Sequence, residues 1–441
     1  MKTAIRTVVA LLAIAAAAGA SAQTVRFLTN ESDPTAVAYY NNVIRAFQAQ
    51  NPGVTVELEA VDSDARLRKI AASLNARTMP EIFKINTEER AEFVRRGFLQ
   101  PLDDLVAEIG EADYVDGALT RIGGRIYDLP YALNQFGILC YRRDVLRAAN
   151  LSPPKTWDDM LATAKATTAG ENFGFIMPAV EGRLTSIFLA QLMWSAGGTF
   201  FDKDLNVTFD NPGTIAALGF LRTAAQFSPR GISSYSWGDM VNVYLTGRVV
   251  QNLYAPRVIE TAARIKRDIL EKTDCSVMPN GPANIGVTFV SPNNLALSTP
   301  AVGGRNTDAA RRFMRFLLSG ERLRDFAMLV YPHMIPPLRS VQQDVIRSAP
   351  GDVIGANLAQ VSYAIDNGLN FESEAGARFV DSRVVRSGVD NPFIGPIIAR
   401  NIPAQVVQRV VLRGEDPARA AAWGAEEMKK LVADLKRTRQ P

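Results

Sequence analysis

Apolar and polar residues follow two alternating patterns along the chain after Gln23, and these predict strands followed by helices. Within 54–58 the apolar residues occupy every second position, which is typical of a half-buried strand. Between 37 and 47 they recur every three or four residues, behind Asp33-Pro34. That spacing predicts a helix with Asp33 as its N-cap. Strands alternating with helices favour a largely parallel sheet with helices on both faces.

The same alternation continues to the end of the chain. We expect further strands over 25–28, 81–86, 139–141, 174–177, 249–253, 276–278 and 295–298. We expect further helices over 65–76, 88–96, 157–168, 187–195, 214–227, 307–318, 404–413 and 417–437. No internal repeat or coiled coil is visible. The sequence therefore predicts an α/β protein, and 441 residues favour two or more domains.

Composition and charge exclude several classes of protein. Hydrophobic residues make up 47% of the chain and charged residues 21%, which is typical of a globular protein. The net charge is +4 without a basic run, which argues against nucleic-acid binding. One histidine (His333) and two cysteines cannot build an HExxH site, a Cys/His zinc site or most histidine-based triads. Phosphate-binding GxxxxGK[ST] and GxSxG nucleophile motifs are absent.

The first 22 residues have the pattern of a secretory signal peptide. Lys2 and Arg6 precede an apolar stretch over 8–18, and Ala20-Ser21-Ala22 forms a cleavage site before Gln23. No cysteine follows this site, so we expect no lipid anchor there. No other stretch has the roughly 18 apolar residues of a membrane helix. We therefore expect a mature protein that acts outside the cytoplasm and is not inserted in the membrane.

The two cysteines lie in apolar, strand-like runs. An oxidising compartment would allow Cys140 and Cys275 to form a disulfide. Free cysteine also behaves as a small buried apolar residue. We expect two buried free thiols and keep the disulfide as the alternative.

Six segments, in order along the chain, carry a resemblance to a known family. They are NPGV at 51–54, GFLQPLDDL at 97–105, LPYALNQFGILCYRRDVL at 129–146, PPKTWDDML at 153–161, WSAGG at 194–198 and VMPNGP at 277–282. Together they resemble the extracellular solute-binding proteins of ABC importers, in the carbohydrate-binding group that includes maltose-binding protein. The resemblance extends from about Val25 to Arg437. Two positions depart from the family pattern: Arg142-Arg143 replaces Asn-Lys, and Arg257 stands where an aromatic residue is common.

The resemblance implies a type II periplasmic binding protein fold, in which two lobes with mostly parallel sheets are joined by hinge strands. The implied N-terminal lobe comprises 23–133 and 290–335, and the C-terminal lobe comprises 136–288 and 338–441. Hinge crossovers are implied at 133–136, 287–290 and 333–338. The implied protein is a periplasmic monomer without a cofactor or catalytic activity. It captures a sugar, oligosaccharide or polyol and delivers it to ABC permease subunits that work with a separate ATPase.

Candidate ligand-binding residues come from strand ends and from the resemblance. Asn30, Glu31, Asp62 and Asn86 follow first-lobe strands, and ligands of α/β sheets bind beyond the carboxyl ends of such strands. The resemblance adds Asn134 and Gln135 at the first crossover, Glu181 and Arg183 in a loop, Tyr254 and Arg257 after a strand, and Asn293. Trp237, in a polar loop, could cover the apolar face of a sugar. For each residue the structural alternative is loop solvation, a surface ion pair or core packing.

Two other hypotheses remain open from the sequence. Arg183 and Arg257 could clamp an anionic ligand, such as a glycerol phosphate or sugar acid, because guanidinium groups bind such anions in a bidentate manner. A secreted glycosidase would need two carboxylates about 5 to 9.5 Å apart, which Glu31, Asp62 and Glu181 could supply. The order of the six segments favours the binding protein over the enzyme.

Overall fold

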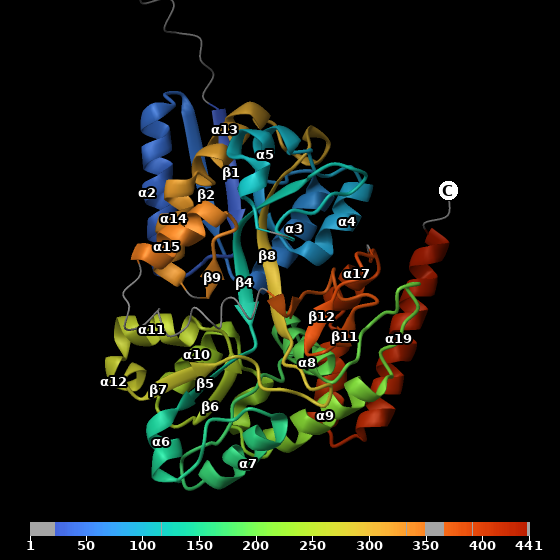
Figure 1. The fold of residues 1–441 in the computed structure, drawn as a ribbon. Coiled ribbons are helices and arrows are strands. Elements are labelled where there is room, and N and C mark those ends of the chain that lie inside the picture. Colours follow the sequence, from blue (N-terminus) through green and yellow to red (C-terminus); the bar gives the residue numbers. More distant parts are fainter. Residues whose placement is uncertain (1–22, 116, 332, 349–365, 390, 439–441) are drawn as a thin grey trace, which may run out of the picture.

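The computed structural model describes residues 23–115, 117–331, 333–348, 366–389 and 391–438. The expected signal peptide, 1–22, lies outside the described residues. Two lobes lie one above the other in Figure 1, and strands β4 and β8 run from one towards the other. Each lobe has its own hydrophobic core.

The first lobe is built on a sheet in the order β2-β1-β3-β8-β4-β9. Its strands are β1 (Gln23–Thr29), β2 (Val54–Ala60), β3 (Ile82–Ile85), β4 (Asp128–Phe136), β8 (Thr288–Leu297) and β9 (Met334–Ile335). Its helices are α2 (Pro34–Gln50), α3 (Ser63–Ala76), α4 (Thr87–Arg95), α5 (Asp103–Ile109), α13 (Thr307–Leu317), α14 (Gly320–Val330) and α15 (Arg339–Ser348). Asp33 caps α2 by accepting a hydrogen bond from the backbone N–H of Thr35, as its sequence predicts.

The second lobe surrounds a small sheet in the order β6-β5-β7, formed by β6 (Gln251–Tyr254), β5 (Ile138–Arg142) and β7 (Thr273–Ser276). Its helices include α6 (Arg143–Ala148), α7 (Trp157–Thr167), α8 (Arg183–Ser195), α9 (Pro212–Ala225), α10 (Trp237–Leu245), α11 (Arg257–Ile265) and α12 (Arg267–Leu270). The C-terminal part adds β10 (Gly368–Leu369), β11 (Arg378–Val380), β12 (Arg383–Val385), α17 (Ile394–Ala399), α18 (Ile402–Val411) and α19 (Pro417–Thr438).

The sheets are mixed rather than mostly parallel as expected. β1 pairs with β2 and β3 in parallel, but β8 pairs with β3 and β4 in antiparallel fashion. β5 is antiparallel to both of its neighbours. The reason is that β4 leaves the first lobe and β8 returns to it, so these two strands must run in opposite directions. Parallel pairing is found where helices connect the strands, as among β1, β2 and β3, and where β10 joins the edge of β8.

The chain changes from one core to the other within its two long strands. In β4, Leu133 packs in the first core and Phe136 in the second. In β8, Phe289 packs in the second core and Val290 against the first. Both strands therefore connect the two lobes.

The third crossover differs from the expected 333–338. Helix α15, assigned to the second lobe from the sequence, buries Val341 and Val345 in the first core. Among the described residues that follow α15, Leu369 is the first that packs in the second core. The apolar face of α15 is visible in the sequence, but its spacing does not indicate which of two cores it packs against.

The cysteines form a disulfide, so the expectation of two free thiols is wrong. Cys140 in β5 and Cys275 in β7 are directly opposite in the antiparallel pair, with Cα atoms 4.0 Å apart. The residues are 135 positions apart in sequence. Their proximity follows from strand pairing that local sequence patterns do not reveal. Within the described ranges no helix is both long and apolar enough to cross a membrane.

Candidate ligand-binding site

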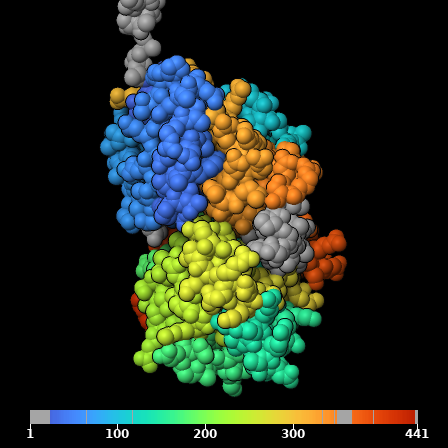
Figure 2. All heavy atoms as spheres, turned by 90° about the vertical axis from the view of Figure 1, so that its left-hand side faces the viewer, coloured from blue at the N-terminus to red at the C-terminus, as the bar shows by residue number. Residues whose placement is uncertain are grey.

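A cavity of about 490 Å³ lies between the two lobes, within the usual size range of ligand pockets. Figure 2 shows the groove that separates the first lobe from the helices of the second. Three groups of elements line it. The carboxyl ends of β1, β2 and β3 form one wall, α8, α10, α11 and the end of β6 form the other, and β4, β8 and the 333–334 segment lie between them.

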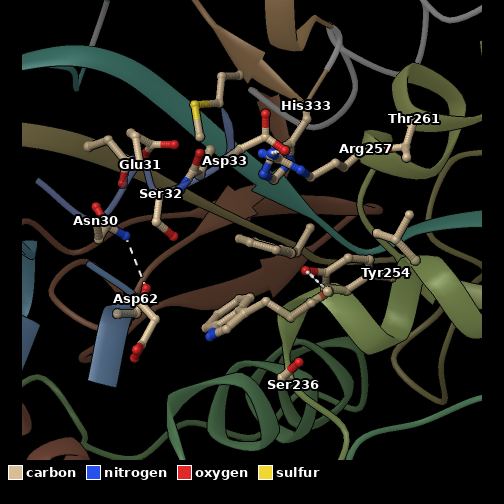
Figure 3. A pocket seen from close by; sticks show the side chains of 18 of the residues that line it. Asn30, Glu31, Ser32, Asp33, Asp62, Ser236, Tyr254, Arg257, Thr261 and His333 are labelled. Atoms are coloured by element: carbon tan, nitrogen blue, oxygen red, sulfur yellow. Dashed lines mark hydrogen bonds and ion pairs between the residues drawn. The ribbon is translucent and has the colours of Figure 1, made fainter. Parts of the chain in front are cut away.

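The first wall brings together the four strand-end residues Asn30, Glu31, Asp62 and Asn86. Asn30 Nδ2 donates to the Ser63 hydroxyl at 3.0 Å (Figure 3). The Glu31 carboxylate accepts a hydrogen bond from the Tyr131 hydroxyl at 2.8 Å. Burial raises the pKa of Glu31 above its ordinary value, although this hydrogen bond acts in the opposite direction. The wall thus presents amide and carboxyl groups, which can bind hydroxyls as donors and acceptors.

The residues between the walls are polar and incompletely paired. Asn134 and Asn293 line the cavity from β4 and β8. Within the described part of the chain, Asn134 Oδ1 and Asn293 Nδ2 are buried without a hydrogen-bond partner, as is Asn30 Oδ1. Buried polar groups in proteins are usually paired. The unpaired amide atoms of these asparagines can therefore form hydrogen bonds with a ligand in the cavity.

His333, the single histidine of the chain, also lines the cavity. Its ring lies 5.4 Å from that of Phe136, centroid to centroid. Burial, together with the positive charge of Arg257, lowers the pKa of His333 to about 3. The imidazole is therefore neutral at physiological pH.

Two aromatic residues stand on the second wall. Trp237 is the first residue of α10, whose N-terminus is fixed by a capping box between Ser236 and Asp239. The rings of Trp237 and Phe136 are 5.6 Å apart. The Tyr254 hydroxyl donates to the backbone oxygen of Trp237 at 3.2 Å (Figure 3). This contact and the cap hold the indole at the edge of the cavity.

Ion pairs join the walls at both sides of the cavity. Arg183 Nε, at the start of α8, lies 2.5 Å from a Glu88 carboxylate oxygen in α4. Burial opposes the charge on Glu88, but the attraction and hydrogen bonds of Arg183, together with a backbone hydrogen bond and the charge of Lys84, lower the Glu88 pKa. Arg257 and Arg264 of α11 approach one Asp33 carboxylate oxygen at 3.7 and 3.9 Å. Figure 3 shows Arg257 extending from the second wall towards Asp33 and His333.

Most sequence-predicted site residues lie around this one cavity, but Gln135 and Glu181 do not. Those that line it are Asn30, Glu31, Asp62, Asn86, Asn134, Arg183, Trp237, Tyr254, Arg257 and Asn293. Gln135 is buried on the opposite face of β4, because successive residues of a strand point to opposite sides. Glu181 accepts a hydrogen bond from Gln405 Nε2 at 2.9 Å, on the surface of the second lobe.

The sequence reasoning missed several residues of the cavity wall. They include Asp33, Ser63, Arg66, Lys84, Thr261 and Arg264. Thr261 and Arg264 follow Arg257 by four and seven residues on α11, so helical spacing could have indicated them. Lys84 is a charged residue within an otherwise apolar strand, and this pattern could have indicated a functional residue.

The family model for bacterial extracellular solute-binding proteins matches residues 31–321. This chain belongs to that family. A binding protein of Brucella abortus is 28% identical over 287 residues, which cover 63% of this chain and 68% of the relative. The ABC transporter periplasmic-binding protein YcjN of Escherichia coli is 22% identical over 360 residues, covering 75% of this chain and 79% of that one. The family consists of ABC transporter binding proteins, which act in the periplasm and are not enzymes.

Solved structures share the fold of this binding protein. Maltose-bound MalE3 of T. maritima has a TM-score of 0.77 at 20% identity and covers 93% of this chain and 100% of its own. A solute-binding protein of Agrobacterium vitis with bound D-mannitol also has a TM-score of 0.77, at 19% identity, covering 95% and 100%. A third, from Agrobacterium radiobacter in complex with ribitol, has a TM-score of 0.75 at 19% identity, covering 93% and 98%. The expected two-lobed fold is thereby confirmed.

Proposed function

We propose that this ABC transporter solute-binding protein captures a neutral sugar, short oligosaccharide or polyol in the cavity between its lobes. Rotation of the lobes about β4 and β8 encloses the ligand, and the closed protein delivers it to the permease. Such closure is a shift between two conformations, driven by a ligand that contacts both walls. In this proposal the leader 1–22 directs the protein to the periplasm, where it acts as a monomer. The ATPase is a separate subunit.

The observation that carries this proposal is the balance of charge around the cavity. Among the described residues, the cations of the wall are Arg66, Lys84, Arg183, Arg257 and Arg264. The carboxylates are Glu31, Asp33 and Asp62 in the wall, together with Glu88, Glu89 and Glu260, which pair with Arg183, Arg66 and Arg264. Each arginine of the wall thus already faces a carboxylate, as Arg257 faces Asp33, so a neutral ligand adds no uncompensated charge to a partly desolvated site.

The remaining features of the wall suit hydroxyl groups and sugar rings. Asparagine side chains can both donate to and accept from hydroxyls, and unpaired hydroxyls in a buried site cost about 1–3 kcal/mol each. Trp237 offers an apolar face beside them. Structural neighbours hold maltose, D-mannitol and ribitol, which agrees with this chemistry.

Titration calorimetry tests the proposal. The panel comprises maltose, D-tagatose, ribitol and D-mannitol, with glycerol 3-phosphate and glucuronate as anionic members. We expect at least one neutral member to bind at one site per chain. If only an anionic member binds, the anionic alternative replaces the proposal. If no member binds, the carbohydrate assignment is abandoned.

The anionic alternative rests on Arg183 and Arg257, and the structure weighs against it. Both guanidinium groups reach the cavity, but Arg183 is hydrogen-bonded to Glu88 and Arg257 faces Asp33. An anionic ligand would have to displace these carboxylates. The glycosidase alternative loses one of its three carboxylates, since Glu181 lies outside the cavity.

Replacing Arg257 by glutamine separates neutral from anionic ligands. We expect the affinity for a neutral ligand to fall by about threefold or less, because glutamine can still donate a hydrogen bond. A ligand anion held by Arg257 would instead lose about tenfold or more, since charged hydrogen bonds contribute about 1.5–3 kcal/mol. Calorimetry on both proteins makes the comparison. A tenfold loss for the neutral ligand would contradict the expected minor role of Arg257.

A further inference from the structure

Lys84 is a buried cation in the cavity wall that the proposed function has not yet used. It lies in β3 between Phe83 and Ile85, and 4% of the residue is exposed. It lines the cavity next to Asn86. A buried ammonium group is unfavourable unless carboxylates or several hydrogen bonds compensate it.

The carboxylates nearest to Lys84 are engaged by arginines. Arg66 donates to both oxygens of Glu89, at 2.7 and 3.1 Å. Arg183 donates to both oxygens of Glu88, at 2.5 and 3.2 Å. Among the described residues, the Lys84 ammonium has Asn86 Oδ1 as its hydrogen-bond acceptor. An ammonium carries three N–H donors, so donors remain for a ligand.

The electrostatic surroundings of Lys84 come from four elements. Arg66 of α3 and Arg183 of α8 repel its charge, while Glu88 and Glu89 of α4 attract it. Glu31, after β1, is a further carboxyl group within electrostatic reach. Burial is the largest effect, and with the two arginines it lowers the pKa of Lys84 to about 7. The ammonium is therefore poorly stabilised while the cavity is empty.

We infer that Lys84 is a specificity-determining residue, whose ammonium group donates hydrogen bonds to oxygen atoms of the bound sugar or polyol at the β3 end of the cavity. This inference rests on the proposed function. The ligand oxygens supply the acceptors that the protein does not. Binding then favours the protonated amine, so the protein takes up protons near pH 7 as the ligand binds. In the empty protein, Lys84 contributes nothing to stability or lowers it.

The ligand-free protein provides the first test, with Lys84→Met and the matched control Arg66→Met. Both residues are buried cations of the same cavity wall, but only Arg66 has a carboxylate partner. We expect Lys84→Met to leave the melting temperature unchanged or raise it by about 1–3 °C, and Arg66→Met to lower it by about 4 °C or more. If Lys84→Met lowers it as much as Arg66→Met, Lys84 is a structural residue and the inference is wrong.

The pH dependence of the same measurement has a definite sign. The folded pKa of Lys84 is depressed to about 7, whereas an unfolded lysine titrates near 10.4. Between these values the unfolded chain binds more protons, so this group makes the wild type more stable as the pH rises. The advantage of Lys84→Met should therefore be largest below pH 7 and shrink towards pH 9. A difference independent of pH from 6 to 9 would contradict the inference.

Ligand binding provides the second test, with D-mannitol, ribitol, D-tagatose and maltose as probes. For whichever probe binds the wild type, we expect Lys84→Met to weaken affinity about tenfold or more. Calorimetry in buffers of different ionisation enthalpy should show proton uptake in the wild type and its loss in the variant. The control Lys69→Met removes a first-lobe surface lysine paired with Glu59 and should change neither quantity.

The two failures are distinguishable. If a neutral probe binds both proteins equally, the inference is wrong while the proposed function stands. If no neutral probe binds the wild type, the proposed function fails, and the assignment of Lys84 to a sugar or polyol fails with it. The ligand-free comparison then still shows whether Lys84 is a structural residue.

Discussion

Replacing Arg90 by methionine is expected to lower the free energy of unfolding by about 3–5 kcal/mol. Arg90 Nε donates to Asp128 at 2.8 Å, and Nη1 donates to Glu372 at 2.9 Å. The side chains of Arg90 and Asp128 are each 1% exposed, and that of Glu372 is 15% exposed. Removing the guanidinium leaves the buried Asp128 carboxylate without its cation and takes a hydrogen-bond donor from Glu372. Urea unfolding of both proteins measures the loss.

The cluster of Arg90, Asp128 and Glu372 joins the two lobes, so the substitution weakens the contact between them. Arg90 and Asp128 belong to the first lobe, whereas Glu372 follows Phe371, which packs in the second core. The loss should diminish towards pH 4, because burial already raises the pKa of Asp128, and protonation relieves an unpaired buried carboxylate. In the variant, the pKa of the folded Asp128 carboxyl lies above that of an unfolded aspartate. The destabilisation by the buried carboxylate is therefore present at neutral pH and decreases as the pH falls.

Arg95→Met is the matched control. Arg95 lies on the same helix and pairs with Glu92 at the surface, where ion pairs contribute about 0–1 kcal/mol. We expect a change within that range. If Arg90→Met and Arg95→Met reduce stability equally, the buried cluster does not hold the lobes together as described.

Replacing Trp237 by alanine is expected to weaken binding of the best neutral ligand by about thirtyfold. Truncating a tryptophan that packs against a ligand can cost about 2 kcal/mol, which corresponds to that factor. The indole lines the cavity and packs against Phe136 of β4. Trp237→Phe, which keeps an aromatic face, should lose much less. Calorimetry measures all three proteins.

Trp423→Ala serves as the comparison for Trp237. Trp423 lies in α19, outside the residues that line the cavity, and stacks on Arg409. Its loss should leave ligand affinity within about twofold of the wild type. A wild-type affinity in Trp237→Ala would show that the indole is not a platform for the ligand.

Local patterns in the sequence predict many of the helices and strands, but they predict pairing over long distances poorly. The strand expected over 174–177 forms only isolated bridges, at Phe173 and Ile176. Asp33-Pro34 begins a helix because a side-chain cap and a proline act within one turn. The Cys140–Cys275 disulfide and the antiparallel placement of β8 depend on which strands meet, and that is decided by packing across the whole lobe. The place of α15 in the first core has the same origin.

The site follows the same division. Asn30, Asp62 and Asn86 could be predicted because the ends of neighbouring parallel strands must meet at one edge of a sheet. The pairing of Arg183 with Glu88 could not, since it depends on how the two lobes face each other. Gln135 does not line the cavity because it points to the other face of β4 from Asn134. Both faces of β4 are buried, so its sequence does not show which face lines the cavity.

Hydrogen–deuterium exchange of the wild type, with and without its best neutral ligand, tests most directly whether the ligand is enclosed between the lobes. Exchange reports local opening, which a bound ligand suppresses where it makes contacts. We predict that the ligand slows exchange in both lobes: in the first-lobe segments 30–33, 62–66 and 84–88, and in the second-lobe segments 236–242 and 254–265. Protection confined to one lobe, or located outside these segments, would contradict capture between the two walls.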